Sequence, residues 1–334
     1  KVGDISRNAS AGNRILNVCD NYVDYDVVKA IKGTLIPAGT VVFAKIGEAV
    51  KLNRRAITGC ECLVDNNAMG IKPDKQHILL DYFFHFISNV RMERLAEATT
   101  VPSVKKSVIE EIEIPSPAIS EQKRIAMELN QVDSLISLRK QQIAKLDELV
   151  KARFVEMFGD PILNDKEFPM LKGEDFFKLS NGKAVPEDKR FTEGIPAFGG
   201  NGISWYTDTV MHTEDTLVVG RVGFQSGNVH LAKGPLWVTD NAMYMSACRF
   251  DLYKLVFLCA LMEHIDFTRY QDAGDLKKVT QKPFMQMSYI QPPMKLQEQF
   301  AAFVAQTDQQ KLTIQHSLAK LELLKKALMQ KYFG

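Results

Sequence analysis

The sequence lacks the motifs by which most enzymes are recognised. It has no GxxxxGK phosphate loop, no GxGxxG turn, no HExxH pair and no GxSxG elbow. The six histidines are scattered along the chain. Residues 186–189, Pro-Glu-Asp-Lys, faintly resemble a nuclease carboxylate-lysine cluster, but a solvated turn is the better interpretation. We therefore predict a non-catalytic chain with no cofactor and no metal site.

Cysteine, net charge and long apolar runs are also scarce. The five cysteines include a CxC at Cys60 and Cys62 without a nearby CxxC or paired histidines, which does not fit a zinc site. We expect reduced thiols and a cytoplasmic protein. A formal net charge of +2 neither requires nor excludes a polyanionic partner. The longest apolar runs, such as residues 255–262, are too short to cross a bilayer, so we expect no membrane contact.

What the sequence does contain is an internal repeat. Residues 114–159 and 290–334 carry the same pattern at a shift of 175 residues. The shift aligns Gln122 with Gln297, Asp133 with Asp308, Lys145-Leu146 with Lys320-Leu321, and Phe158-Gly159 with Phe333-Gly334. A repeat of this kind fixes the architecture. Two equivalent modules, each followed by a long helix, are suited to a target that itself has two parts.

The segments before the long helices correspond more loosely. Each half has a β-rich run with a cation near its end, at residues 41–47 and 217–223. Asn67 and Asn241 each precede Ala-Met, and amphipathic helices are expected over residues 79–97 and 252–270. The lysine pairs at 105–106 and 277–278 then appear equivalent, and strands bounded by proline are expected over residues 112–115 and 288–292.

The two long helices have the spacing of a coiled coil. Residues 121–157 contain no proline or glycine, and apolar residues recur at alternating intervals of four and three. The predicted pairing seam consists of Ile125, Leu129, Val132, Ile136, Ile143, Leu146, Val150, Val304, Ile314, Leu318, Leu321 and Leu328. Its charged interruptions fall at different levels in the two helices, at Arg139 and Arg153 and at Lys311 and Lys325. This favours antiparallel pairing within one chain over packing of each helix on its own module.

The expected fold is α+β, with two tandem α/β domains and two long helices that pair as an antiparallel coiled coil with pseudo-twofold symmetry. We place domain 1 at residues 1–118, helix 1 at 119–159, domain 2 at 160–293 and helix 2 at 294–334. Because the chain starts at Lys1 without a methionine, we expect domain 1 to lack some N-terminal residues.

The remaining chemistry is that of binding. Arg and Lys can contact guanine or phosphate, Asn and Gln can contact adenine, and Gly-rich loops can present amides to phosphate. The candidate DNA-binding residues are Lys45, Arg54, Arg55, Lys105, Lys106, Gly199, Gly200, Asn201, Arg221, Gln225, Lys277 and Lys278. Alternatives stay open. Gly-Gly-Asn-Gly could be only a turn, Lys45 and Arg221 could be structural ion-pair partners, and we expect Asn67 and Asn241 to be buried side chains that satisfy loop backbone.

Several segments resemble the specificity subunit of type I restriction-modification enzymes. The resemblance rests on Ile-Pro-Ser-Pro at 114–117, Ser-Glu-Gln-Lys-Arg-Ile-Ala at 120–126, the run at 138–149, Phe-Val-Glu-Met-Phe-Gly-Asp-Pro at 154–161 and the terminal residues 328–334. Residues 1–6 and 195–202 fit at the domain level. The resemblance covers essentially the whole chain, and its helical motif is the most specific part.

The resemblance implies a division of labour. Each domain would recognise one half of a bipartite site on double-stranded DNA, and the helices would set the gap and dock two modification subunits. Methylation and ATP-dependent cleavage would belong to modification and restriction subunits. Two alternatives remain, a tandem ligand-binding scaffold that does not bind DNA and a piece of a single-chain restriction-methylation enzyme. Only DNA binding should weaken steeply with salt.

Overall fold

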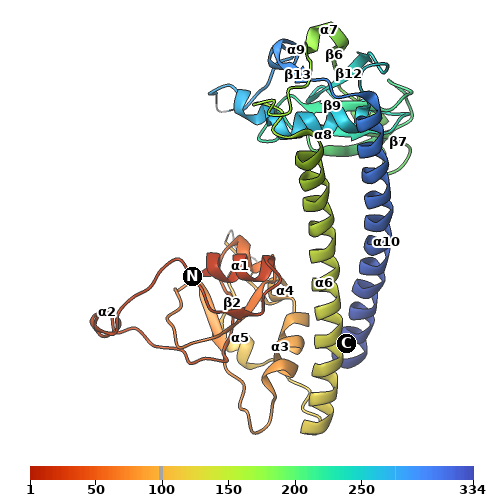
Figure 1. Cartoon of the computed structure of the whole chain (residues 1–334). Helices are drawn as coiled ribbons and strands as arrows, with labels where there is room; N and C mark the ends of the chain where they lie inside the picture. Colours follow the sequence, from red (N-terminus) through yellow and green to blue (C-terminus); the bar gives the residue numbers. More distant parts are fainter. Residues whose placement is uncertain (98–100, 275) are drawn as a thin grey trace. The chain divides into compact units, whose positions relative to one another are not determined.

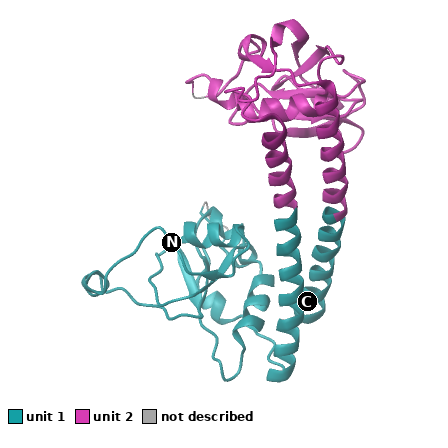
Figure 2. Cartoon of the chain, in the orientation of Figure 1, with its two compact units in different colours: residues 1–142, 314–334 teal, residues 143–313 magenta. Residues whose placement is uncertain are grey.

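The computed structural model describes residues 1–97, 101–274 and 276–334 (Figure 1). The chain divides into two compact units (Figure 2). Unit 1 comprises residues 1–142 and 314–334, and unit 2 comprises residues 143–313. Each unit contains one mixed α+β module and segments of both long helices, so each unit is built from both halves of the sequence.

A four-stranded sheet forms the centre of the unit 1 module, in the order β1-β3-β2-β4. Its middle strand β2 has the sequence Val-Val-Phe-Ala and is wholly buried, as expected for β-branched and aromatic residues covered on both faces. β2 is antiparallel to β3 and β4, while β1 is parallel to β3. The elements are α1 (Val2–Ser10), β1 (Ile15–Leu16), α2 (Tyr25–Ala30), β2 (Val41–Ala44), η1 (Glu48–Val50), β3 (Arg55–Thr58), β4 (Ala68–Ile71), α3 (Leu80–Asn89), α4 (Met92–Leu95) and α5 (Lys106–Glu110).

Unit 2 has a four-stranded antiparallel sheet in the order β10-β9-β12-β6, a three-stranded sheet β11-β7-β8 and the pair β13-β5. Its strands are β5 (Met170–Lys172), β6 (Phe177–Asn181), β7 (Ile195–Gly199), β8 (Gly202–Thr207), β9 (Thr216–Gly220), β10 (Val229–Ala232), β11 (Trp237–Val238), β12 (Ala242–Cys248) and β13 (Ser288–Ile290). Its helices are α7 (Gly173–Phe176), η2 (Glu187–Lys189), α8 (Leu255–Ile265), η3 (Phe267–Tyr270) and α9 (Lys282–Gln286).

Three strands have the same arrangement in both units. The order β3-β2-β4 of unit 1 matches the order β10-β9-β12 of unit 2, and the central strand is antiparallel to both neighbours in each case. The strands also follow one another in the same order along the chain. The internal repeat predicted from the sequence is therefore confirmed inside each module.

The long helices are α6 (Ile119–Phe158) and α10 (Met294–Phe333), each of 40 residues. In unit 1, Leu129 and Leu328 share one apolar cluster, and Lys140 forms an ion pair with Glu322. In unit 2, Phe158 packs against Phe300. Residue numbers rise in one helix as they fall in the other, so the helices are antiparallel in both units, as predicted.

The seam between the helices accommodates charge by pairing it across the helices. None of the predicted seam residues is exposed. Lys325 of α10 lies 2.6 Å from a carboxylate oxygen of Asp133 in unit 1, and Lys311 pairs with Asp147 in unit 2. The side chain of Arg153 lies over the ring of Phe303 in unit 2, which suits a cation in an apolar seam. Lys311, Lys325 and Arg153 thus each meet an acid or an aromatic ring of the other helix.

A buried glutamine fixes the module to its helix in unit 1. The Oε1 atom of Gln122 accepts a hydrogen bond from the Leu79 amide at 2.9 Å, at the start of α3. Its Nε2 atom donates to the carbonyls of His77 at 2.8 Å and Pro117 at 2.9 Å. The side chain thereby satisfies backbone groups that a helix start leaves unpaired.

Unit 2 repeats this arrangement with every partner shifted by 175 residues. Gln297 Oε1 accepts from the Lys254 amide at 2.9 Å, at the start of α8. Gln297 Nε2 donates to the carbonyls of Leu252 and Pro292, both at 2.9 Å. Both glutamines have 0% relative exposure. The repeat found in the sequence therefore extends to individual hydrogen bonds.

The last aromatic residue of each long helix packs at an equivalent position. Phe333 ends α10, and its ring lies edge-on to Tyr82 of α3 at 5.3 Å. Phe158 ends α6 and lies edge-on to Phe257 of α8 at 4.7 Å. Tyr82 and Phe257 are themselves 175 residues apart, so each module is completed by the C-terminal end of one long helix.

The helix expected over residues 79–97 is interrupted. α3 ends at Asn89 and α4 covers only Met92–Leu95. The Val90 carbonyl accepts a hydrogen bond from Arg55 at 2.7 Å, and the Met92 amide donates to Asn53 Oδ1 at 3.0 Å. The side chains of Arg55 and Asn53 thus pair with a backbone carbonyl and a backbone amide that a continuous helix would pair within itself. The prediction of one helix was therefore wrong.

Two further expectations differ in detail. The helix expected over residues 252–270 is α8 followed by η3, because Asp266 adopts a left-handed conformation with φ of 58°. The strand expected over residues 288–292 is present as β13, paired with β5. Residues 112–115 form no strand among the described residues, so that expectation was wrong.

Candidate nucleic-acid interface

In unit 2 several loops gather at the C-terminal end of β9. The Gly223 amide donates to the Lys277 carbonyl at 2.8 Å, and the Arg221 amide donates to the Asn241 carbonyl at 2.9 Å. The Val279 amide in turn donates to the Arg221 carbonyl at 2.9 Å. Segments 221–228, 239–241, 271–274 and 276–279 thus form one edge, defined here as the β9 edge. Polar loops held by a rigid sheet are where binding residues are most often found.

Glycines let the β7–β8 turn approach this edge. A Cβ atom on Gly220 would lie 2.5 Å from the Gln225 carbonyl oxygen and 3.0 Å from the Gly200 carbonyl oxygen. A Cβ atom on Gly199 would lie 2.6 Å from Ser204 Oγ. Gly199 and Gly200 therefore have packing roles, as the turn interpretation anticipated, while Asn201 is the exposed residue of the turn.

The polar side chains of the β9 edge are partly held in place. Arg221 donates from Nε and Nη2 to the Asp240 carbonyl, at 3.1 and 2.8 Å. Gln225 Oε1 accepts a hydrogen bond from the side chain of Asn228. Lys277 Nζ is 3.4 Å from the Asp272 carbonyl, and Lys278 is exposed. Fixed cations of this kind are suited to phosphate contacts, because less side-chain freedom is lost on binding.

Unit 1 has an equivalent edge at the end of β2. The Lys45 amide donates to the Asn67 carbonyl at 2.8 Å, and the Val104 amide donates to the Lys45 carbonyl at 2.8 Å. The Gly47 amide donates to the Pro102 carbonyl at 2.8 Å. These bonds match those of Arg221 and Gly223 in unit 2. Lys45 and Arg221 therefore occupy equivalent backbone positions, as the sequence suggested.

The same bonds correct the alignment of the lysine pairs. Val104 and Val279 are equivalent because each amide binds the carbonyl of the matched cation. The bridges Ile46–Ser103 and Val222–Lys278 agree with this register. Lys278 therefore matches Ser103, and Lys105 matches Thr280. The prediction that the two lysine pairs are equivalent was wrong, although both pairs lie in the corresponding loop.

Arg55 is not placed to contact DNA. It is 4% exposed and donates to the carbonyl of Asn53 at 2.6 Å and of Val90 at 2.7 Å. Burial, with a smaller effect of Arg91, lowers the pKa of its guanidinium to about 10. We therefore correct its assignment to a structural role. Arg54 is half-buried and remains a candidate.

Asn67 and Asn241 also differ from expectation. Both are exposed rather than buried. The backbone carbonyls of these residues, and not their side chains, make the matched bonds to Lys45 and Arg221. Their amide side chains are therefore open to a ligand at the rim of each edge.

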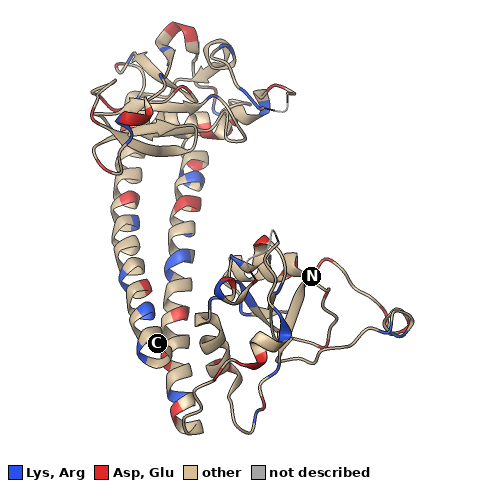
Figure 3. Cartoon of the chain, turned by 180° about the vertical axis from the view of Figure 1, so that it is seen from behind, with Lys and Arg blue, Asp and Glu red and all other residues tan. Residues whose placement is uncertain are grey.

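The cations near the unit 1 edge have acidic neighbours. Lys105 lies 2.6 Å from Glu97, and Lys106 lies 3.2 Å from Glu110. Figure 3 shows that basic and acidic residues are interspersed over the chain. Exposed ion pairs of this kind contribute little stability, so these lysines can exchange a carboxylate for a phosphate at small cost.

Two residues of the β9 edge were missed from the sequence. Gln271 donates from Nε2 to the carbonyls of Phe224 at 3.2 Å and Ser226 at 2.7 Å. Nothing in the sequence pattern marks it. Phe224 directly precedes Gln225, which the sequence analysis named as a candidate.

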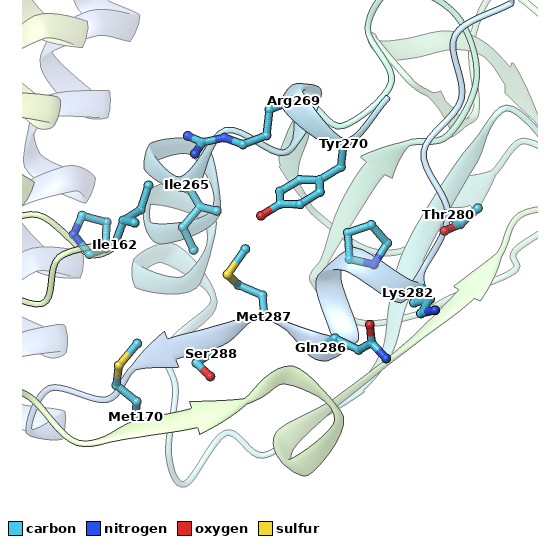
Figure 4. A pocket seen from close by; sticks show the side chains of 12 residues that line it. Ile162, Met170, Ile265, Arg269, Tyr270, Thr280, Lys282, Gln286, Met287 and Ser288 are labelled. Carbon is cyan, nitrogen blue, oxygen red and sulfur yellow. The ribbon is translucent and has the colours of Figure 1, made fainter. Parts of the chain in front are cut away.

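A cavity of about 650 Å³ lies elsewhere in unit 2 (Figure 4). Ile265, Tyr270 and Met287 give it an apolar lining, with Arg269 and Lys282 as its basic residues. No acidic side chain lines it within the described residues. The cavity thus has binding groups but no pair of acid and base suited to catalysis.

The described residues contain neither a candidate metal site nor a candidate membrane span. In the described part of the chain, no group of three or more His, Cys, Asp or Glu side chains could hold a metal ion. Residues 187–189, of the weak nuclease-like cluster, form the exposed turn η2. No helix among the described residues is long and apolar enough to cross a membrane.

Comparison with known proteins identifies the class of this fold. A family model described as "Type I restriction modification DNA specificity domain" matches residues 5–148. A crystal structure of a type I restriction-modification S subunit from M. genitalium has the same fold, with a TM-score of 0.60 and 17% identity, over 89% of this chain and 83% of that one.

Relatives in sequence carry related names. The MjaX specificity subunit of Methanocaldococcus jannaschii is 21% identical over 303 residues, which cover 79% of this chain and 70% of that protein. A type I specificity subunit of Mycoplasma genitalium is 25% identical over 264 residues, which cover 73% and 67%. The resemblance seen in the sequence is confirmed: the matching family model, these relatives and the similar crystal structure all carry the name of the DNA specificity component of type I restriction-modification systems.

Proposed function

We propose that each module of this chain recognises one half of a bipartite site on double-stranded DNA. In this proposal residues 1–118 and 160–293 are the two recognition domains, and residues 119–159 and 294–334 are the spacers. The observation that supports it most is the repeated edge, with Lys45 and Arg221 at matched backbone positions. Two equivalent readers on one chain are suited to two half-sites that share neither sequence nor symmetry.

The long helices would set the gap between the half-sites. A continuous helix of 40 residues is about 60 Å long, and readers on one face of B-DNA are spaced by about 34 Å per helical turn. Buried glutamines and terminal aromatic rings attach each module to the helices at both junctions. A stiff spacer with fixed junctions would make the gap a property of the chain.

Partner subunits would supply the catalysis. We propose that the helices dock two modification subunits and that restriction subunits join through the assembled complex, in the cytoplasm where the DNA lies. Exposed leucines outside the seam, including Leu138, Leu149 and Leu323, leave apolar surface on both helices. Such surface is suited to helix-helix docking. Methyl transfer and ATP-dependent cleavage would then need no residue of this chain.

Methylation mapping tests the proposal. Co-expressed with a modification subunit, the chain should direct methylation of a motif with two short fixed parts separated by a gap of constant length. Replacing residues 162–289 by another module should alter one half of the motif only. A continuous motif, or a change in both halves, would refute independent readers.

Salt dependence distinguishes DNA recognition from a scaffold that binds another ligand. Binding of the complex to its motif should weaken steeply as salt rises, because each phosphate contact releases counterions. Lys277→Ala and Lys278→Ala should reduce the slope by about one per lost contact. Binding that is indifferent to salt would favour the tandem scaffold.

A further inference from the structure

The loop that follows β9 carries an unusually exposed aromatic side chain. Phe224 is 87% exposed, the highest value among the large apolar side chains of the described residues. A single exposed apolar residue is common and needs no explanation by itself. What makes Phe224 informative is the contrast between this side chain and the loop that holds it.

The backbone of the loop is held by bonds at its base and across its turn. The Gly227 amide donates to the Gly220 carbonyl at 2.8 Å, and the Gly220 amide donates to the Asn228 carbonyl at 2.9 Å. The Ser226 amide donates to the Gly223 carbonyl at 3.0 Å, closing the turn around Phe224. The loop therefore holds Phe224 at its tip on a hydrogen-bonded base.

Neighbouring residues fix the loop from outside. Gln271 binds the carbonyls on both sides of Gln225, those of Phe224 and Ser226. Ser226 is fully buried. A Cβ atom on Gly227, where φ is 96°, would lie 2.7 Å from the Phe267 backbone, so only glycine fits there. An aromatic ring presented this way loses little conformational freedom when it binds.

The surroundings of Phe224 are basic and polar. Arg221 and Gln225 belong to the same loop, and the Gly223 amide is bonded to Lys277. Asp240 and Asp272 are the nearby acids. The Asp240 backbone carbonyl accepts hydrogen bonds from the Arg221 guanidinium, and the Asp272 backbone carbonyl lies 3.4 Å from Lys277 Nζ. The Asp272 carboxylate accepts a hydrogen bond from the Lys278 backbone amide. A ring flanked by cations is suited to a polyanion that has flat apolar faces, which is the chemistry of stacked bases.

We propose that Phe224 is a wedge that inserts between two stacked bases in the half-site recognised by unit 2. This inference rests on the proposed function. Apolar side chains that enter a base step partly unstack it and kink the duplex. The cost depends on the step, so the wedge would favour flexible pyrimidine–purine steps and add specificity at a step whose base edges it does not contact.

Unit 1 carries a different residue at the matched position. Gly47 is the counterpart of Gly223, since their amides bind the carbonyls of Pro102 and Lys277 at matched places. The next residue is Glu48, whose carboxylate lies 2.8 Å from Lys51. A carboxylate does not stack on bases, and it is repelled by phosphate. The wedge should therefore distort one half-site only.

Local unstacking can be measured directly. The complex of this chain with its modification subunit is bound to a duplex carrying the mapped motif, in which 2-aminopurine replaces one adenine at a time. Wild type should raise 2-aminopurine fluorescence several-fold at one step of one half-site. Phe224→Ala should remove that rise and weaken binding about 10-fold or more, the loss expected for one base–aromatic stack.

Two variants serve as controls. Phe224→Trp keeps an aromatic face and should retain both the fluorescence rise and the affinity. Phe250→Ala removes another exposed ring of unit 2, 50% exposed in the turn after β12, and should change neither. The methylated motif should keep both half-sites in the Trp variant, whereas Phe224→Ala should relax the preference at the distorted step.

The following outcomes would contradict the proposal that Phe224 is a wedge. Wild type that binds the motif without any fluorescence rise, or Phe224→Ala that binds as tightly as wild type, contradicts it. Phe224→Ala that impairs assembly with the modification subunit but leaves the fluorescence rise intact would assign Phe224 to a protein contact. Failure of wild type to bind any bipartite duplex would refute the proposed function as well. This result differs from those that contradict only the wedge.

Discussion

The two units attach their modules to the same pair of helices by different chemistry. In unit 1 a polar cluster lies beside the apolar contacts of Tyr82. His85 of α3 is almost fully buried and binds Asn130 of α6 at 2.7 Å. Arg14 donates to Asp133 of α6 at 2.8 Å, and Lys325 of α10 binds the same carboxylate. Five polar side chains from the module and both helices thus meet in one cluster.

In unit 2 the corresponding contact is aromatic. Phe154 of α6 is fully buried and lies 4.1 Å from the ring of His264 in α8. It also packs against Phe158, Phe257 and Phe300, at centroid distances of 5.1 to 5.9 Å. The position that matches His85 is Ala260, and the position that matches Phe154 is Met329. The bonds of Gln122 and Gln297 and the contacts of the terminal aromatic rings are what the two units share.

This difference shows which part of the junction the fold requires. Gln122 and Gln297 bind backbone, so their role does not depend on the side chains of the module. The surrounding side chains differ between the units: polar contacts attach the module in unit 1, and aromatic contacts attach the equivalent elements in unit 2. The stability of the polar contacts depends on protonation, while that of the aromatic contacts depends on packing volume.

The largest expected effect is loss of the aromatic contact. Phe154→Ala should reduce the free energy of unfolding of unit 2 by about 3–5 kcal/mol, through lost burial and a residual cavity. Met329→Ala, the matched change in unit 1, should cost less because a flexible side chain leaves a smaller void. Both tryptophans, Trp205 and Trp237, lie in unit 2, so their fluorescence during urea unfolding reports the first change.

If Phe154→Ala and Met329→Ala destabilised their units equally, the difference between the aromatic and polar contacts would be contradicted. Hydrogen exchange of amides in α3 and α8 resolves the two units separately. Protection should fall in α8 for Phe154→Ala and in α3 for Met329→Ala.

The polar cluster predicts a pH dependence of the stability of unit 1. Burial, opposed by the Asn130 hydrogen bond and reinforced by Arg14, lowers the pKa of His85 to about 4 from an ordinary value of 6.5. Below pH 6.5 the unfolded chain takes up the proton more readily than the folded one. The stability from His85 is therefore full above pH 6.5 and is lost as pH falls towards 4, by about 3 kcal/mol.

His85→Gln keeps a donor for Asn130 but removes the titration. It should flatten the loss of α3 protection between pH 6.5 and 4, after correction for intrinsic exchange. An unchanged slope would show that His85 does not control it. Burial opposes ionisation of Asp133, but Lys325 and Arg14 outweigh it and lower its pKa, so its own contribution is lost only at lower pH.

Loss of the Gln122 side chain in unit 1 and of the Gln297 side chain in unit 2 should have similar effects on stability. Gln122→Ala and Gln297→Ala each leave one amide and two carbonyls without their partner, at a cost of about 1–3 kcal/mol. The expected result is a similar loss of protection at the starts of α3 and α8. Gln→Glu at either position keeps the acceptor and removes the donor, which separates the two contributions. A large loss in one unit only would show that the junctions are not equivalent.

The smallest effect is expected at the exposed cross-helix pair of unit 2. Asp147→Asn should change stability by less than about 1 kcal/mol, because its pair with Lys311 is largely solvated. Asp133→Asn in unit 1 should cost more, since Asp133 is half-buried and holds two cations. Addition of 1 M salt should reduce the first effect but largely preserve the second.

The sequence was most informative where the pattern is periodic. The absence of proline and glycine over residues 121–157 and the four–three spacing predict α6 and its pairing with α10, because helix geometry is local. Gln122 and Gln297 were aligned from the sequence, yet two of the three hydrogen bonds of each side chain reach backbone groups 43 and 45 positions away. Such contacts leave no periodic trace.

Loop chemistry was less predictable for a physical reason. Arg55 and Arg54 look alike in sequence, but only the structure shows that Arg55 points at the carbonyls of Asn53 and Val90. The two lysine pairs looked equivalent because identical letters recur. The true register is set by Val104 and Val279, both almost fully buried, because burial and not charge fixes the backbone there.

One measurement tests the central claim most directly. Seven residues of seam sequence are inserted into both helices, after Gln142 in α6 and after Thr313 in α10, where the units meet in the sequence. A heptad preserves the seam register, adds about 10 Å and corresponds to about three base pairs of B-DNA. Methylation mapping should then show both half-sites unchanged and the gap between them lengthened by about three base pairs. An unchanged gap in a folded, active complex would contradict the account.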